Sequence, residues 1–468
     1  MFASVFTAIP SFQMVFFGKN PKTLLVVIKI FWVWFVFTIV QRYVKSSFND
    51  LNLGKNKKQF HTFDICIFAF YNFIDKWTKF TFKFIFNLFS FQLRKIQMVD
   101  LQGQYTKIQT EIDQKIASIL QSAAFIKGKD VSEFEAELAS YLGVKHVISC
   151  ANGTDALQIA MMGLELQPGD EVITVDFTFA ATVEVIALLG LKPVLVDVYP
   201  DTMTMNLEQL KAAITPQTKA IVPVHLFGQC ADMESIMQIA QENNLLVIED
   251  NAQAIGANFT FKNGKTQKAG TIGHIGTTSF FPSKNLGCYG DGGALFTHDD
   301  VLAEKLKSIA NHGMSTRYYY DRIGINSRLD TLQAGILRIK LPHLDTYAAA
   351  RIKVADFYDQ AFANCEQIIT PKRAHFSTHV FHQYTLQLKQ VDRSALQKHL
   401  NERDIPNMIY YPVPIHTQKA YQNFKFDSNQ LGVTKQLCET VLSLPIHTEM
   451  EEEQMKYITK TVLAFFNK

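Results

Sequence analysis

One short segment combines residues that suit a phosphate group. In ANGTDALQIA (151–160), Asn152, Gly153, Thr154 and Asp155 open a helix directly after the apolar run HVISC. The start of a helix presents free N–H groups and a partial positive charge, which favour an anion. Gly153 allows close approach of the backbone, and Thr154 adds a hydroxyl donor. An ordinary helix cap without a ligand is the alternative interpretation.

A second segment, VIEDNAQAIGA (247–257), places a carboxylate at the end of an apolar run. Asp250 is suited to pair with a protonated pyridine nitrogen, which keeps a cofactor ring cationic and able to accept carbanion electrons. Gln253 follows within one short turn and is suited to donate to a phenolic oxygen of such a ring. The alternative for Asp250 is a solvated acid in a loop.

The third segment, SFFPSKNLGCYGDGGALFT (279–297), contains a lysine between an apolar run and a glycine-rich turn. A lysine acts as a Schiff-base nucleophile when burial lowers its pKa, and Lys284 is the candidate. Ser279 is positioned to reach the same phosphate as Thr154. Taken by itself, a lysine beside glycines is more often a surface residue.

These segments belong to a region in which strands and helices alternate. Helical patterns such as 155–166 and 232–244 fall between apolar runs that are bounded by turn residues. This alternation predicts an α/β fold with a mostly parallel sheet covered on both faces, and ligands on such sheets bind beyond the carboxyl ends of the strands. The predicted strands are 171–177, 193–198, 220–227, 245–250, 277–281 and 293–297.

The pattern changes after about residue 345. Residues 379–388 and 407–416 are predicted as strands of a smaller α+β domain, with a helix at 394–404 between them. The chain ends on a predicted helix that begins near Met450. We therefore expect a large domain over 98–345 and a small C-terminal domain over 346–468.

Residues 1–97 form an apolar, basic leader. They hold 20 of the 38 Phe, and 13 Lys and Arg against 3 Asp and Glu. The apolar run 23–40 contains Lys29 and is near the lower length limit of a membrane-spanning helix. A misassigned start, with the native protein beginning at Met98, is the favoured interpretation. A membrane anchor and a segment lying on anionic lipid are the alternatives.

The charge distribution and the cysteine content argue against two kinds of binding site. The positive charge is concentrated in the leader and the body is acidic, so net charge does not favour nucleic-acid binding. The six Cys are scattered without metal-ligand spacing, which predicts free thiols in a reducing compartment and no zinc site.

In order and spacing, four strings resemble the DegT–StrS family of sugar aminotransferases: CANGTDALQIA, IEDNAQAIGA, SFFPSKNLGCYGDGGA and INSRLDTLQAGIL. The resemblance runs from about Val99 to the C-terminus. It implies the aspartate-aminotransferase type of pyridoxal-phosphate (PLP) fold, called fold type I, with a mostly parallel seven-stranded sheet in the large domain.

The resemblance also assigns roles to residues that bind the cofactor. Lys284 would carry PLP as a Schiff base, and Asp250 would pair with the pyridine nitrogen. Gln253 would contact the ring hydroxyl, and Phe179 would stack on the ring face, although core packing is the alternative for Phe179. The positions that match the family's phosphate site are Gly153, Thr154 and Ser279.

A further match implies a shared active site. Asn326 and Arg328, in GINSRLD, match positions that the family supplies from the neighbouring subunit. Asn326 would reach the cofactor phosphate, and Arg328 would meet anionic substrate. The active site would then be complete only in a homodimer.

The sugar site is implied for the segment YYPVPIH, with Tyr410, Tyr411 and His416 as candidates. The nearest resemblance is to enzymes that aminate UDP-2-acetamido-3-oxo-glucuronate, which carry His-Tyr where this chain has Tyr410-Tyr411. Because of this departure, the resemblance does not carry the uronate substrate over to this chain. It still implies a nucleotide-linked 3-keto sugar.

The expected function is therefore amino transfer from L-glutamate to a nucleotide-linked keto sugar, in the cytoplasm, for surface glycan or polysaccharide biosynthesis. One alternative is a sugar dehydratase of the same fold, in which a His replaces the Schiff-base lysine. The other is a non-catalytic, membrane-attached binding or regulatory protein that keeps the fold.

Overall fold

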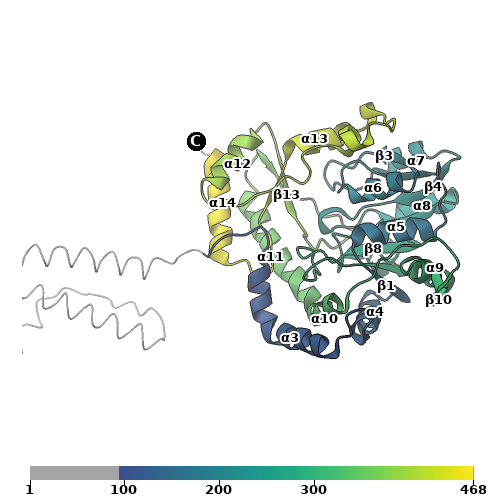
Figure 1. Cartoon of the computed structure of the whole chain (residues 1–468). Helices are drawn as coiled ribbons and strands as arrows, with labels where there is room; N and C mark the ends of the chain where they lie inside the picture. Colours follow the sequence, from purple (N-terminus) through teal and green to yellow (C-terminus); the bar gives the residue numbers. More distant parts are fainter. Residues whose placement is uncertain (1–93, 467–468) are drawn as a thin grey trace, which may run out of the picture. The chain divides into compact units, whose positions relative to one another are not determined.

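The computed structural model describes residues 94–466, which are built around one seven-stranded sheet (Figure 1). The strand order is β1-β9-β8-β5-β4-β2-β3. Strand β9 runs antiparallel to β1 and β8, and the other neighbouring pairs are parallel. The predicted mostly parallel sheet is thus confirmed. Its strands are β1 (His146–Cys150), β2 (Glu171–Val175), β3 (Lys192–Val196), β4 (Thr218–Val222), β5 (Leu246–Asp250), β8 (Ile275–Ser279) and β9 (Gly293–Thr297).

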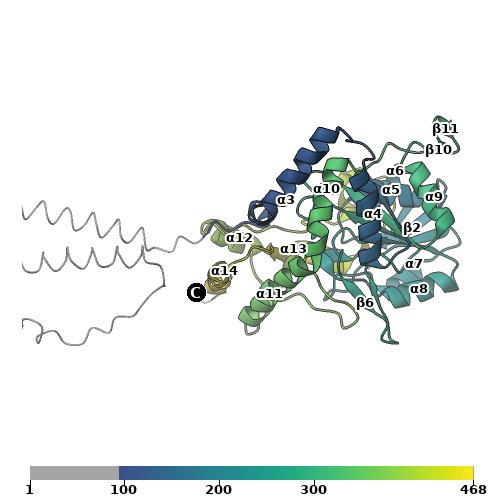
Figure 2. The ribbon, with the colours of Figure 1, turned by 90° about the horizontal axis from the view of Figure 1, so that it is seen from below.

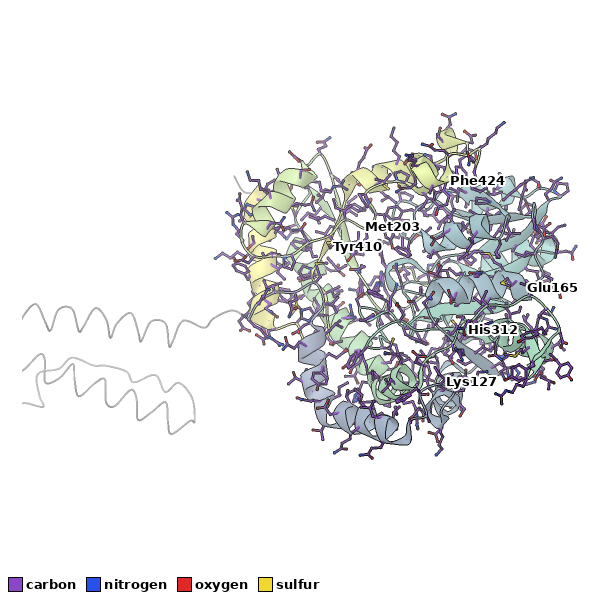
Figure 3. All side chains as sticks on the ribbon, in the orientation of Figure 1. Lys127, Glu165, Met203, His312, Tyr410 and Phe424 are labelled. Carbon is purple, nitrogen blue, oxygen red and sulfur yellow. The ribbon has the colours of Figure 1, made fainter. Side chains whose placement is uncertain are left out.

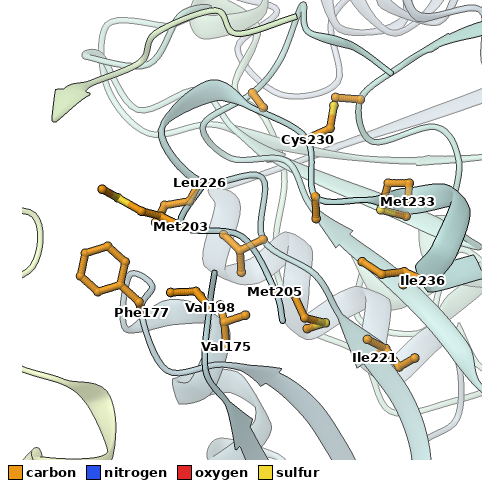
Figure 4. Packing of buried hydrophobic residues seen from close by; sticks show 14 of the residues in the cluster. Val175, Phe177, Val198, Met203, Met205, Ile221, Leu226, Cys230, Met233 and Ile236 are labelled. Carbon is orange, nitrogen blue, oxygen red and sulfur yellow. The ribbon is translucent and has the colours of Figure 1, made fainter. Parts of the chain in front are cut away.

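Helices cover both faces of this sheet because successive strand residues point in opposite directions. In β2, Ile173 joins the hydrophobic cluster under α7 (Leu207–Ala213) and α8 (Met233–Glu242), part of which is drawn in Figure 4. Its neighbour Val172 joins the opposite cluster, which packs against the helices α5 (Gly153–Gly163), α6 (Ala181–Leu188) and α9 (Asp300–Ile309).

The β1 edge of the sheet is covered by two further helices. Phe134 of α4 (Lys129–Leu142) and Leu337 of α10 (Thr331–Lys340) share a buried cluster with Val147 of β1. The long helix α3 (Leu101–Ser122) begins at its cap Asp100, which accepts a hydrogen bond from the backbone of Gly103 at 2.8 Å. Figure 2 shows α3 beside α10, and both contribute to one small hydrophobic cluster.

A smaller α+β region follows along the chain. The strands β12 (Ile368–Ile369), β13 (Tyr384–Leu388) and β14 (Val441–Leu444) form an antiparallel sheet. Most members of one hydrophobic cluster lie after residue 351. The placement of the domain boundary at residues 345 and 346 stays a prediction. The helices of this region are α11 (Leu344–Phe362), α12 (Arg393–Asn401), α13 (Gly432–Thr440) and α14 (Glu452–Phe466).

Two short hairpins and five 3-10 turns complete the described elements. The hairpins pair β6 (Asn258–Thr260) with β7 (Thr266–Lys268), and β10 (Met314–Thr316) with β11 (Tyr319–Tyr320). The 3-10 turns are η1 (Leu226–Gly228), η2 (Leu341–His343), η3 (Ile415–Thr417), η4 (Lys419–Tyr421) and η5 (Ser428–Gln430).

The prediction of a strand over residues 407–416 is wrong. The segment forms a single β-bridge, between Met408 and Ser443, and then leaves the small sheet. Pro412 and Pro414 have no N–H to donate to a ladder, so pairing cannot continue along the segment. The aromatic side chains between them and Met408 pack against the large sheet instead.

The leader lies outside the described residues except for its last four residues, 94–97. Its interpretation as a misassigned start, an anchor or an interfacial segment therefore stays a prediction. Between residues 94 and 466, none of the helices has the length and apolarity needed to cross a membrane.

Candidate active site

The start of α5 and the end of β8 meet closely. Asn152 caps the helix by accepting a hydrogen bond from the backbone of Asp155 at 2.8 Å. The N–H groups of Gly153 and Thr154 then have no partner within the helix. A Cβ at position 153 would lie 2.7 Å from Cβ of Ser279, so only glycine fits here. The two predicted phosphate-binding segments are thus side by side.

Asp250 ends β5 and is nearly fully buried. Its Oδ2 accepts a hydrogen bond from the hydroxyl of Thr182 at 2.7 Å, and its Oδ1 accepts one from the backbone of Ala252 at 3.1 Å. One donor from α6 and one from the turn after β5 therefore fix the orientation of the carboxylate. This is the arrangement expected of a group that must present one charge to a ligand.

Lys284 lies five residues beyond the end of β8, in a turn closed by its backbone hydrogen bond to Phe281 at 2.8 Å. The side chain is only partly covered, but its amine lies deep among protein atoms. This desolvation lowers the pKa of Lys284 to about 8, and the nearby charge of Asp250 acts in the opposite direction. A lysine with such a pKa has a substantial neutral, nucleophilic fraction near neutral pH.

The predicted aromatic partner, Phe179, is 57% exposed, which excludes the alternative of core packing. Its ring lies 6.2 Å from that of Tyr411. The Tyr411 hydroxyl accepts a hydrogen bond from Nε2 of Gln253 at 3.1 Å, while Oε1 of Gln253 accepts one from the backbone of Phe227 at 2.8 Å. Gln253 therefore connects the predicted cofactor region to the predicted sugar region.

The other predicted sugar-binding residues also face the large domain. Figure 3 labels Tyr410, which is half-buried, and burial raises its pKa. Asp176, directly after β2, accepts hydrogen bonds from the backbone of His416 at 2.8 Å and pairs with its Nδ1 at 2.6 Å. Burial raises the pKa of Asp176, and the contacts with His416 oppose this effect. The remaining ring nitrogen, Nε2, stays available for a ligand.

Asn326 and Arg328 lie elsewhere. Asn326 is exposed and forms a β-bridge with Asn311. Arg328 lines a pocket whose walls do not include Lys284 or Asp250. Within the described chain, the structure does not bring these two residues to the other predicted site residues.

Sequence reasoning missed two polar groups that contact site residues and one on the opposite face of β5. Thr182 and Asp176 contact site residues, and the signal that could have found Asp176 is its position at a strand end. Glu249, beside Asp250 on β5, faces the other way. It pairs with Nε2 of His225 at 2.8 Å and accepts hydrogen bonds from the backbone of Gly270, Ile272 and Gly273.

These residues fit PLP. The paired α5 and β8 termini suit its phosphate, since a Cβ on Gly153 would fill the space beside Ser279. The Asp250 carboxylate suits the pyridine nitrogen, and the amine of Lys284 is partly deprotonated. The exposed ring of Phe179 offers a flat surface for stacking.

Comparison with known proteins extends this picture. A model of the DegT/DnrJ/EryC1/StrS aminotransferase family matches residues 106–463. A solved structure of a DegT DnrJ EryC1 StrS aminotransferase from Brucella abortus superimposes with a TM-score of 0.76 at 41% identity, covering 80% of this chain and 100% of that chain.

Three curated relatives are similar over almost their whole length. A pleiotropic regulatory protein of Geobacillus stearothermophilus is 44% identical over 79% of this chain and 98% of its own. The UDP-2-acetamido-2-deoxy-3-oxo-D-glucuronate aminotransferase of Pseudomonas aeruginosa is 44% identical over 78% and 98%. The UDP-N-acetyl-3-dehydro-alpha-D-glucosamine 3-aminotransferase of Acidithiobacillus ferrooxidans is 45% identical over 78% and 97%.

Proposed function

Because this chain belongs to the DegT/DnrJ/EryC1/StrS family and is a PLP-dependent aminotransferase, we propose that it aminates a nucleotide-linked 3-keto sugar, with L-glutamate as the amino donor. The observation that carries the proposal is that Asp250 ends β5, Lys284 follows the adjacent strand β8, and the start of α5 meets Ser279 at the end of β8. A surface glycan or polysaccharide would receive the amino sugar, and the reaction would take place in the cytoplasm.

Each residue has a distinct task in this reaction. When bound, PLP supplies an electron sink for the carbanion that forms as the amino group is transferred. Asp250 holds a negative charge beside the ring nitrogen, and Thr182 and Ala252 fix its direction. The N–H groups of Gly153 and Thr154, together with the Ser279 hydroxyl, bind the phosphate.

Lys284 has two tasks. Its neutral amine binds the cofactor covalently, and burial favours that neutral form. When it is free, Nζ would move the proton between Cα of glutamate and the bound cofactor. When the sugar reacts, the same nitrogen carries the proton in the opposite direction.

The two UDP-sugar relatives support the 3-keto position, because both are named for substrates with an oxidised carbon 3. One of those substrates is a uronate and the other is not. We propose the non-uronate class, because Tyr410 departs from the His-Tyr pair of the uronate enzymes. Tyr410, Tyr411 and His416 would surround the sugar, with His416 oriented by Asp176.

We also propose a homodimer in which Asn326 and Arg328 complete the site of the neighbouring subunit. Neither residue contacts the predicted cofactor residues of its own chain within the described part. Nearby Tyr318, Tyr319, Tyr320 and Ile323 are between 61% and 85% exposed, and apolar side chains so exposed favour burial in an interface.

Two alternative functions, a sugar dehydratase and a non-catalytic regulator, can each be compared with the residues of this site. A dehydratase of this fold has His at the lysine position, and Lys284 stands there in this chain. A non-catalytic regulator is the second rival, and one relative carries a regulatory name. A buried, oriented Asp250 beside an amine of lowered pKa supports a working site.

The decisive experiment is a screen of UDP- and dTDP-linked keto sugars with glutamate as donor. Wild type is expected to release 2-oxoglutarate and an amino sugar, and borohydride should fix PLP to Lys284. The Lys284→Ala variant should show neither amino transfer nor fixation of PLP by borohydride. The Lys268→Ala variant, which changes a lysine outside the site, should show both. A wild-type protein that binds no PLP would refute the proposal.

The shared site has its own test. Lys284→Ala and Arg328→Ala protomers are each expected to be inactive as homodimers. Mixed after reversible dissociation, they should regain activity, because one site of the heterodimer then has every intact residue. Mixtures that stay inactive, while wild type dissociates and reassociates with full activity, would show that each chain has a complete site.

A further inference from the structure

The last residue of helix α10, Lys340, has a buried side chain. It is 1% exposed, and its Nζ donates a hydrogen bond to the carbonyl of Gly287, in the glycine-rich turn that follows Lys284. Figure 2 shows α10 between α3 and α4, and it shares a hydrophobic cluster with each of them. The helices at the β1 edge of the sheet therefore contribute a polar contact to the active-site turn.

Burying the ammonium group of Lys340 is energetically costly. Across residues 94–466 no carboxylate pairs with it, and desolvation lowers its pKa to about 8. The ring of Tyr289, whose centroid lies 5.3 Å from Nζ, and the carbonyl end of α10 offset part of this cost. A methionine has a similar volume and no charge to desolvate. Packing alone therefore does not explain a lysine at this position.

The turn that accepts this hydrogen bond is tight. A Cβ at position 287 would lie 2.3 Å from the carbonyl oxygen of Pro282, so only glycine fits there. Lys284 stands between these two residues, and its backbone N–H donates to the carbonyl of Phe281 at 2.8 Å. Because the two ends of the turn touch and leave no space for movement, a contact that holds Gly287 also restrains Lys284.

Two amide side chains hold the same turn from other directions. Nδ2 of Asn285 donates to the carbonyl of Val380 at 3.0 Å. The side chain of Gln333, on α10, exchanges hydrogen bonds with the backbone of Tyr289 at 2.8 and 3.3 Å. Among these contacts, Lys340 supplies the charged donor, and hydrogen bonds from charged donors are the stronger kind. Loss of Lys340 should therefore loosen the turn more than loss of either amide.

We propose that Lys340 is a positioning residue, which holds Nζ of Lys284 where it can react with PLP. The inference rests on the proposed function, in which Lys284 binds the cofactor covalently. The phosphate is assigned to the start of α5 and the end of β8, and within residues 94–466 Lys340 donates a hydrogen bond to neither. The effect of Lys340 should therefore appear in the covalent step and not in the initial binding of PLP.

Rapid mixing of the cofactor-free enzyme with increasing concentrations of PLP separates these two steps. The concentration at half-saturation reports the initial binding, and the limiting rate of the absorbance change reports the covalent step. Lys340→Met is expected to lower the limiting rate about tenfold and to change the half-saturation by less than about twofold, because a small misplacement of a reacting atom slows its reaction strongly. Lys340→Gln, whose amide ends one bond short of the ammonium position, should slow the covalent step similarly, and it provides the test if the methionine variant does not fold.

Arg338→Met is the matched control, because Arg338 also lies on α10 but pairs with three carboxylates of α4 rather than with the turn. It should lose stability in urea denaturation and still react with PLP as wild type does. A wild-type limiting rate in the Lys340 variants, or an equal loss in Arg338→Met, would overturn the proposal while leaving the proposed function intact. A wild type in which borohydride fixes no PLP to Lys284 would refute the proposed function, and this inference with it.

Discussion

At the residue scale, the Thr182 hydroxyl orients the Asp250 carboxylate, and a second threonine hydroxyl lies close to that of Thr182. Thr182 donates to Oδ2 of Asp250 at 2.7 Å. The hydroxyl of Thr178 lies 3.3 Å from that of Thr182, and it has no hydrogen bond to Asp250. Both threonines are buried. Substituting each in turn therefore distinguishes the effect of the hydrogen bond to Asp250 from the effect of altering a buried threonine.

Thr182→Val is expected to lower kcat about tenfold, because a hydrogen bond to a charged group is worth about 1.5–3 kcal/mol and Asp250 loses one of its two fixed donors. Steady-state kinetics with glutamate and the keto sugar measure the change. Thr178→Val removes a buried hydroxyl of the same size and should leave kcat near wild type. Equal losses in the two variants would mean that packing, and not the bond to Asp250, matters.

The amine of Lys284 gives a pH dependence. With a pKa of about 8, it is mostly protonated at pH 7 and mostly neutral at pH 9. The rate at which the cofactor-free enzyme binds PLP covalently should therefore rise about tenfold over this interval and then level off. Absorbance after rapid mixing measures this rate. A rate that still rises beyond pH 10 would indicate an ordinary, solvated lysine.

At the scale of elements, the proposed phosphate site depends on how closely α5 approaches β8. Gly153 is the point of contact, and its missing side chain sets the distance. Interiors are packed too densely to absorb an added methyl group without movement. The start of the helix must therefore shift if the glycine is replaced.

Gly153→Ala is expected to weaken PLP binding about tenfold, because the displaced N–H groups no longer meet the phosphate. Equilibrium titration of the cofactor-free enzyme with PLP gives the dissociation constant. Gly432→Ala is the control, since nothing lies within 4 Å of a Cβ there. An unchanged PLP affinity in Gly153→Ala would show that the helix start does not hold the phosphate.

Elements were predictable from sequence where local pattern and tertiary environment agree. GALFT forms a strand with the predicted bounds, because a buried apolar run between turn residues suits a sheet covered on both faces. The segment 407–416 has a similar apolar pattern, but its prolines and its contacts with the large sheet prevent a strand. The contacts of Asp250 with Thr182 and of Asp176 with His416 join residues far apart in the chain, so no local pattern could reveal them.

At the scale of the whole molecule, Arg351 holds together segments from different parts of the chain. It lies on α11 and is 3% exposed. Its Nη1 donates to the carbonyls of Phe381, His382 and Ile446 at 3.0–3.3 Å. The 381–382 segment lies next to the Lys284 turn, because Asn285 donates to the carbonyl of Val380 at 3.0 Å.

Arg351→Met is expected to destabilise the protein by about 2–4 kcal/mol, because three buried carbonyls lose a charged donor. Urea denaturation followed by circular dichroism measures the loss. Lys353→Met, on the exposed face of the same helix, should change stability by less than about 0.5 kcal/mol. Similar midpoints for the two variants would contradict a structural role for Arg351.

The opposite orientations of Glu249 and Asp250 on β5 limit how this enzyme can be altered. One carboxylate serves the cofactor side and the other holds His225 and the 270–273 loop, so a one-residue slip of the strand would exchange their surroundings. An insertion or deletion in β5 would therefore remove both sets of contacts at once. Libraries built to change the sugar should vary residues 408–416 and leave residues 246–250 intact.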